Sequence, residues 1–234
     1  MRIAGKGLIN REKTVNFKFD GRSYKGFEGD TVASALLASG KKLFGRSFKY
    51  HRPRGVLTAG SEEPNALITV GQGAFQDPNV RATTQEIFEG LITKSQNNWP
   101  NLQYDILSIN DLFSNFLGAG FYYKTFMWPK SFWEKIYEPF IRRAAGLGAL
   151  SGLHNSDTYE KAYAFCDLLI IGGGPSGLMA AKIAAEAGLD VILAEQEPIF
   201  GGRLNSETEK VDGIPGSDWA AKIIEELKKL DNLR

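Results

Sequence analysis

The chain has 234 residues, of which 43% are hydrophobic and 24% are charged, and its formal net charge is +1. This composition excludes an intrinsically disordered chain and is typical of one large or two small globular domains. We expect no membrane partner, because no stretch approaches the ~18 uncharged apolar residues of a membrane span. The lack of an apolar secretory signal and the single cysteine, Cys166, favour a cytoplasmic protein.

The first region, residues 1–90, has the pattern of an α+β domain of the β-grasp kind. Asp20-Gly21 predicts a tight hairpin turn, because both residues tolerate a positive φ angle. Asp30 or Thr31 is expected to cap a helix that ends at Gly40. Alternating apolar and polar residues and turn residues predict strands at 15–19, 22–27, 56–57, 67–70 and 80–88, and a helix at 32–38.

Residues 91–163 form an aromatic-rich connector. Eleven aromatic residues lie between positions 105 and 140, and Pro100, Pro129 and Pro139 divide the segment into short pieces. Exposed side chains of this size favour aggregation. We therefore expect them to be buried between two domains or against another subunit, or else to form an ordinary domain core.

The third region, residues 164–234, has the pattern of an α/β domain. A largely apolar strand over 167–171, expected to be buried on both faces, leads into a glycine-rich loop. After it we predict a helix at 178–187, a strand at 190–194 and a helix at 219–230. This order is the start of a Rossmann FAD/NAD(P)-binding domain, which needs further parallel strands. We therefore expect a truncated domain with an exposed apolar strand edge and poor stability alone.

The glycine fingerprint Gly172-x-Gly174-x-x-Gly177 carries the chemistry of this region. Gly172 permits the turn from strand to helix, Gly174 lets the backbone approach a pyrophosphate, and Gly177 lets helix and strand pack together. The N-terminus of the following helix offers free N–H groups to the phosphates. Glu195, 18 residues after Gly177, is expected to accept hydrogen bonds from both hydroxyls of an adenosine ribose. An acid there favours NAD or FAD over NADP.

The fingerprint itself does not separate FAD from NAD. Gly201-Gly202-Arg203-Leu204 follows Glu195 closely, and this run is common in flavoproteins that have two dinucleotide-binding domains. There it forms a turn beside the cofactor, so its presence favours a flavoprotein-type Rossmann domain over a simple dehydrogenase.

Basic and histidine residues outside the fingerprint offer weaker patterns. Residues 41–54 combine six cations with interleaved aromatic residues, and residues 1–60 hold 13 Lys and Arg against 4 Asp and Glu. Such a stretch could bind single-stranded nucleic acid. Because the fingerprint favours an enzyme, we interpret it as a structured loop and expect no nucleic-acid partner. His51 and His154 lack the spacing of a metal site or catalytic triad, and Cys166 precedes a buried strand, where a reactive thiol is not expected.

Several stretches together resemble the alpha subunit of heterotetrameric sarcosine oxidase. The resemblance covers nearly the whole chain, and its long aromatic motif is far more specific than the glycine fingerprint. It identifies the chain as the N-terminal part of such a subunit. The matching pieces are Asp20-Gly21 with Tyr24 and Gly26, Gly29 to Ala38, Arg46 to Gly55, Glu62 to Ala66, Ala119 to Pro129, Ala144 to Gly148, and Cys166-Asp167 leading into the fingerprint.

The resemblance implies that the first region is similar to plant-type ferredoxins. In relatives that bear a cluster, a C-x₄-C-x₂-C run follows the Arg-Pro-Arg-Gly loop, and the corresponding positions here are Thr58, Glu63 and Ala66. None of these residues ligates iron as a thiolate. We therefore predict a structural remnant without a [2Fe–2S] cluster.

The resemblance also implies that the Rossmann region binds NAD, with FAD as the alternative at the same motif. No catalytic residue and no metal ligand is identified in the chain. The predicted cofactor-binding residues are Gly172, Gly174, Pro175, Ser176, Gly177, Glu195, Gln196, Gly201, Gly202 and Arg203.

For the whole complex, the resemblance implies oxidative demethylation of sarcosine to glycine, with hydrogen peroxide as a product. Sarcosine is oxidised at an FAD on the beta subunit, and electrons pass to an FMN between alpha and beta and then to oxygen. The methyl group leaves as formaldehyde or is passed to tetrahydrofolate. The expected partners are the beta, gamma and delta subunits, and this segment is expected to help assemble them without being active alone.

Two alternative functions stay open. The first is the alpha subunit of a related FAD-dependent amino-acid dehydrogenase, which the missing cysteines disfavour. The second is a non-catalytic assembly or nucleic-acid-binding module that uses the basic residues of the first region.

Overall fold

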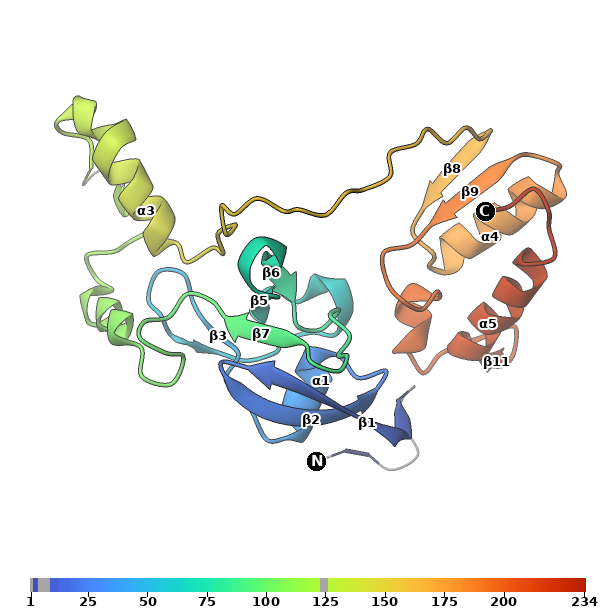
Figure 1. Ribbon diagram of the computed structural model, residues 1–234, viewed down its shortest axis with the longest axis horizontal. Coiled ribbons are helices and arrows are strands. Elements are labelled where there is room, and N and C mark those ends of the chain that lie inside the picture. Colours follow the sequence, from blue (N-terminus) through green and yellow to red (C-terminus); the bar gives the residue numbers. More distant parts are fainter. Residues whose placement is uncertain (1, 4–8, 123–125) are drawn as a thin grey trace. The chain divides into compact units, whose positions relative to one another are not determined.

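The computed structural model describes residues 2–3, 9–122 and 126–234. The chain divides into two compact units, Met1–Asp157 and Thr158–Arg234 (Figure 1). Each unit has its own hydrophobic core and is described by itself. Within the described ranges, no helix is long and apolar enough to cross a membrane.

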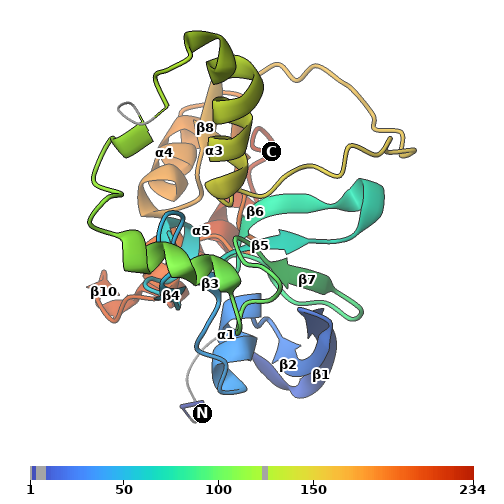
Figure 2. The same ribbon diagram turned by 90° about the vertical axis from the view of Figure 1, so that its left-hand side faces the viewer.

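A five-stranded sheet organises the first unit (Figure 2). Its strand order is β2-β1-β7-β5-β6, in which β1 and β7 are parallel and the other neighbours are antiparallel. One helix, α1 (Val32–Ala38), packs against it, which gives the expected α+β arrangement. The strands are β1 (Asn10–Phe19), β2 (Arg22–Glu28), β5 (Leu67–Val70), β6 (Asp77–Arg81) and β7 (Ile92–Ser95).

The turn and the helix cap predicted for this unit are both present. Asp20 and Gly21 join β1 to β2 with φ angles of 50° and 76°. Thr31 caps α1 in a reciprocal capping box with Ser34, so two backbone N–H groups at the helix start are satisfied.

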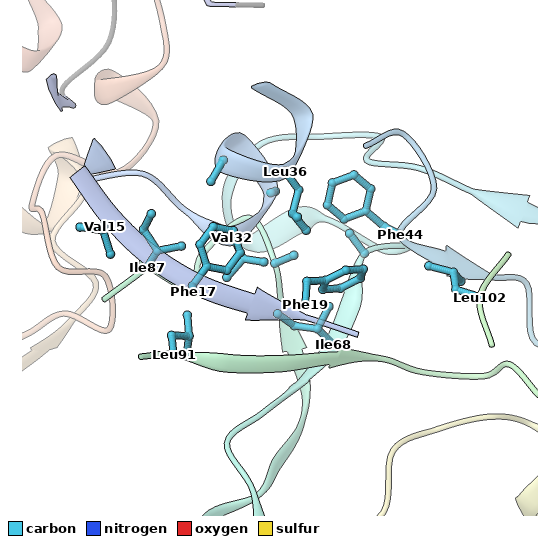
Figure 3. Packing of buried hydrophobic residues seen from close by; sticks show 14 residues of the cluster. Val15, Phe17, Phe19, Val32, Leu36, Phe44, Ile68, Ile87, Leu91 and Leu102 are labelled. Atoms are coloured by element: carbon cyan, nitrogen blue, oxygen red, sulfur yellow. The ribbon is translucent and has the colours of Figure 1, made fainter. Parts of the chain in front are cut away.

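The core of the first unit lies between α1 and the sheet. Alternation along β1 puts Val15, Phe17 and Phe19 on the buried side, where they meet Val32 and Leu36 of α1 (Figure 3). Full burial of one such side chain stabilises a fold by about 1.5–3 kcal/mol. This packing fixes the register of β1, because a shift by one residue would expose all three side chains.

Two strands predicted in the first unit are not where the sequence pattern put them. No strand forms at 56–57; the short pair β3 (Gly45–Arg46) and β4 (Pro53–Arg54) precedes that position. The strand predicted at 80–88 corresponds only to β6, which ends at Arg81. The following residues turn towards α1 instead, and the carbonyl groups of Ala82 and Gln85 accept hydrogen bonds from the first turn of that helix.

The connector consists of short helical segments with exposed apolar side chains. The 3₁₀ segment Ile106–Phe113 and a π-helical turn, Trp133–Tyr137, precede α3 (Glu138–Ala144). Phe116 and Trp128 are each 83% exposed. The interpretation of this segment as an ordinary domain core is therefore wrong for these side chains, while burial between two domains or against another subunit stays a prediction.

The second unit is a short parallel sheet packed on two helices. Strands β8 and β9 are parallel, and residues 232–234 run along the other side of β9, where Val191 N–H donates to the Asn232 carbonyl. The elements are β8 (Leu168–Ile171), α4 (Pro175–Glu186), β9 (Val191–Ala194), the 3₁₀ turn Gly202–Asn205, β10 (Lys210–Val211), β11 (Ile214–Pro215) and α5 (Gly216–Leu227).

Strand β8 is covered on one face only, contrary to the prediction of burial on both faces. Ile170 packs with the core of the second unit, whereas Leu169 and Ile171 are 54% and 83% exposed. Helix α4 packs on the Ile170 side, where a Cβ on Gly177 would lie 3.5 Å from the Ile170 side chain, and no described element of the unit covers Leu169 and Ile171. The apolar composition of β8 therefore predicts a further covering layer that this unit does not supply.

Candidate functional site

The fingerprint loop between β8 and α4 requires glycine at two positions for different reasons. Gly172 has a φ angle of 104°, a conformation that side chains with a Cβ rarely adopt. A Cβ on Gly177 would lie 1.9 Å from the carbonyl oxygen of Gly172. At Gly174, by contrast, a Cβ would meet no atom of the chain within 4 Å, so this position faces open space.

The N-terminus of α4 faces this loop with unsatisfied donors. Gly174 is the N-cap, Pro175 lies in the first turn, and the first intrahelical bond runs from Leu178 N–H to the Gly174 carbonyl at 2.9 Å. The N–H groups of Ser176 and Gly177 precede that bond. They are therefore positioned to donate to an anion, which the positive end of the helix dipole also favours.

The second glycine pair lies directly against the fingerprint. Gly201 N–H donates to the Gly173 carbonyl at 2.8 Å, and a Cβ on Gly202 would lie 3.2 Å from the Cα of Gly174. The structure thus brings the two predicted glycine runs together at one place. The Arg203 side chain instead forms an ion pair with Glu207 at 2.7 Å and is 83% exposed.

Glu195 at the end of β9 is held by backbone donors. Its carboxylate accepts hydrogen bonds from the N–H groups of Gly173, Gln196 and Glu197. Burial acts to raise the pKa of Glu195, but these three N–H groups lower it to below its ordinary value. The acid is therefore ionised at neutral pH, and Gln196 contributes its backbone N–H group while its side chain is exposed.

Glu197 was not among the residues predicted from the sequence. It is half-buried, and burial together with the charge of Glu195 raises the pKa of its carboxyl. The only sequence pattern that could have identified it is an acid two residues beyond the predicted ribose ligand.

Three of the six cations in the basic stretch bind the connector. Arg46 donates to the carbonyl groups of Leu102 and Gln103, Lys49 to that of Gly118, and Arg52 pairs with a connector carboxylate at 2.7 Å. These contacts agree with the interpretation of a structured loop.

A buried pair joins the same two segments. Nδ1 of His51 lies 2.6 Å from the carboxylate of Asp105, and both side chains are almost inaccessible to solvent. The same carboxylate accepts hydrogen bonds from the N–H groups of Trp99 and Leu107. His51 is thus committed to a structural contact, and no group of three metal-ligating side chains occurs among the described residues.

The loop at the ferredoxin-type positions is organised around one carboxylate. Glu63 is 1% exposed and accepts hydrogen bonds from the N–H groups of Leu57, Thr58, Asn65 and Ala66 at 2.7–3.1 Å. This network accounts for the missing strand at 56–57, because the donor of Leu57 is used inside the loop. The Oγ1 atom of Thr58 is buried and has no hydrogen-bond partner.

Two family models match the two units separately. Residues 12–98 match a 2Fe-2S iron-sulfur cluster binding domain, and residues 167–229 match an FAD dependent oxidoreductase. A ferredoxin-like region is therefore followed by an oxidoreductase region, as the sequence predicts in outline.

Curated relatives match the chain over almost its entire length. It is 56% identical over 233 residues to a sarcosine oxidase subunit alpha of Rhizobium meliloti (strain 1021), covering 100% of this chain and 24% of that protein. The chain is a relative of sarcosine oxidase alpha subunits. A second such subunit, from Corynebacterium sp. (strain U-96), is 32% identical over 94% of this chain and 18% of its own length. The chain thus spans about a quarter or less of these relatives.

A solved structure supports the fold. The L-proline dehydrogenase from P. horikoshii matches with a TM-score of 0.51 and 20% identity, over 96% of this chain and 33% of that one. At this identity the match shows the fold alone.

The prediction of a chain without an iron–sulfur cluster is contradicted by the match over residues 12–98, because that family is one of cluster-binding domains. The prediction was based on the missing thiolates at Thr58, Glu63 and Ala66. Such clusters are held by cysteine thiolates, and the one cysteine, Cys166, lies outside the matched residues. Thr58, Glu63 and Ala66 therefore do not form a thiolate ligand set.

Proposed function

We propose that the chain is part of the alpha subunit of a flavin-dependent oxidoreductase of the sarcosine oxidase type, and that its second unit binds NAD. The observation that carries the proposal is the convergence of the fingerprint loop, the Gly201-Gly202 turn and the Glu195 carboxylate at the N-terminus of α4. Convergent N–H donors, open space and an acid at a strand end are what an adenine dinucleotide requires.

Each part of the site has a separate task in binding. The N–H groups of Ser176 and Gly177 hold the pyrophosphate, and the bare backbone at Gly174 lets it approach. The ionised Glu195 accepts a hydrogen bond from the adenosine ribose. When bound, a nicotinamide dinucleotide supplies hydride-transfer chemistry, and the chain provides its binding and orientation.

The first unit and the connector serve assembly in this proposal. The exposed aromatic side chains of the connector, such as Phe116 and Trp128, are suited to burial against another subunit. In the whole complex, the substrate would be sarcosine, which is oxidatively demethylated at a flavin held outside this chain.

The test uses the purified complex that contains this chain. Oxygen uptake is measured with sarcosine, and the bound nucleotides are released and identified by mass. We expect sarcosine-dependent oxygen uptake and NAD. Finding FAD in place of NAD on the alpha subunit would contradict the proposed cofactor. A lack of oxygen uptake with sarcosine would contradict the proposed substrate.

A second candidate is the alpha subunit of a related FAD-dependent amino-acid dehydrogenase. The match of residues 12–98 to a cluster-binding family favours it. A dehydrogenase would reduce a dye with an amino acid such as L-proline and show little oxygen uptake. An iron–sulfur absorbance band in the purified protein would support this candidate over the first.

A further inference from the structure

The carboxylate of Glu195 is nearly saturated by the chain itself. Its Oε1 atom accepts from the N–H groups of Gln196 and Glu197 at 2.7 and 2.9 Å, and its Oε2 atom accepts from Gly173. An ionised carboxylate has about four lone-pair positions, so one remains for a ligand. An adenosine ribose with free 2′- and 3′-hydroxyls brings two donors. A second acceptor is therefore needed if both hydroxyls are to be bound.

Glu197 is the nearby group that can supply this second hydrogen-bond acceptor. It follows Glu195 on the same turn and is half-buried, and the described residues give its carboxylate no hydrogen-bond partner. The charge of Glu195 contributes to raising the pKa of Glu197, so the two carboxylates interact across the turn. A half-buried, unpaired acid next to another acid does not stabilise the fold, and such groups occur preferentially at functional sites.

We propose that Glu197 is a specificity-determining residue that, with Glu195, selects an adenosine ribose bearing a free 2′-hydroxyl and rejects one bearing a 2′-phosphate. This inference rests on the proposed function, because it requires an adenine dinucleotide at the fingerprint loop. A hydroxyl can donate to the free carboxylate, whereas a 2′-phosphate would place a like charge against two partly buried carboxylates. The selection applies to NAD and to FAD alike, since both contain ADP.

The test measures the dissociation constants of ADP and 2′-phospho-ADP by calorimetry, on the purified protein freed of bound nucleotide. We expect Glu197→Gln to reduce the preference for ADP by about tenfold, mainly through tighter binding of 2′-phospho-ADP. Glu197→Arg is expected to reduce it further. Glu209→Gln is the matched control, because Glu209 is an exposed acid of the same unit and its substitution removes the same charge.

The outcomes separate this inference from the proposed function. If the unmodified protein binds ADP and both Glu197 variants keep its preference unchanged, Glu197 is not a specificity residue and the dinucleotide site stands. If the unmodified protein binds none of ADP, NAD and FAD, the proposed function fails and the inference fails with it. Thermal unfolding of each variant confirms that a changed preference is not a loss of fold.

Discussion

At the residue scale, the glycines of the fingerprint have different roles, in stability and in ligand binding. Gly177 is required by packing, since a Cβ there would lie 1.9 Å from the Gly172 carbonyl oxygen, whereas Gly174 faces open space. We expect Gly177→Ala to destabilise the second unit by about 2 kcal/mol. Gly174→Ala should change stability by no more than about 0.5 kcal/mol, yet weaken dinucleotide binding tenfold or more, since its methyl group would meet the pyrophosphate. Thermal unfolding and calorimetric binding of both variants check this; equal stability of the two would contradict it.

A second residue-scale prediction concerns the carboxylate inside the ferredoxin-type loop. Burial acts to raise the pKa of Glu63, but four backbone N–H groups lower it to below its ordinary value of 4.5. A carboxyl whose pKa is lowered by folding stabilises the fold above its unfolded pKa, and this stabilisation is lost as the pH falls through the folded value. Glu63→Gln places an amide donor against N–H groups, so it should cost about 2 kcal/mol at neutral pH.

The pH dependence distinguishes that role from a general loss of stability. The temperature of thermal unfolding, measured from neutral pH to below pH 4.5, should fall less steeply with decreasing pH for Glu63→Gln than for the unmodified protein. Glu62→Gln, an exposed neighbour, is the control and should leave the profile unchanged. Identical profiles for all three proteins would show that the Glu63 charge does not hold the loop.

At the element scale, two side-chain contacts between the connector and the basic stretch of the first unit differ in burial. Asp105 is buried with His51, whereas Asp111 pairs with Arg52 at an exposed position. Asp105→Asn leaves buried donors without their charged partner, so it should lower the free energy of unfolding by about 3 kcal/mol. Asp111→Asn should cost less than about 1 kcal/mol. Chemical denaturation of both variants, with hydrogen exchange over residues 99–113, tests this. If both variants lose the same free energy of unfolding, burial does not decide the strength of the contact.

Element by element, local patterns predicted what depends on neighbouring residues in the sequence. The Asp20-Gly21 turn and the α1 cap follow from the conformational preferences of single residues. The segment after β6 could not be predicted in this way, because its backbone groups pair with α1 and not with a strand. The exposure of Leu169 in β8 was also missed, since an apolar run does not reveal which layer covers it.

The candidate site was likewise predicted in part from the sequence. The spacing of the glycines predicted a loop that the structure brings together with the Gly201-Gly202 turn, because the positive φ angle of Gly172 and the close packing of Gly177 both require glycine. The spacing did not reveal that the Glu195 carboxylate is mostly occupied by backbone donors, nor that Glu197 is half-buried beside it. Both depend on how the turn after β9 folds back on the loop.

At the scale of the whole molecule, the division into two units predicts where a protease acts. Residues 147–166 contain no helix or strand, and Lys161 is exposed within them. Limited trypsin treatment should therefore cut first at Lys161, leaving the helices and strands of both units intact, and mass measurement of the fragments would locate the cut. A first cut before residue 147 or after residue 166 would contradict the division.

We propose that the second unit, with its fingerprint loop and Glu195, holds an adenine dinucleotide. The most direct measurement is the mass of the nucleotide released from the natively purified protein, in parallel with the Gly174→Ala variant. We expect NAD from the unmodified protein and little or none from the variant. Release of no adenine dinucleotide, or equal release from both proteins, would contradict it.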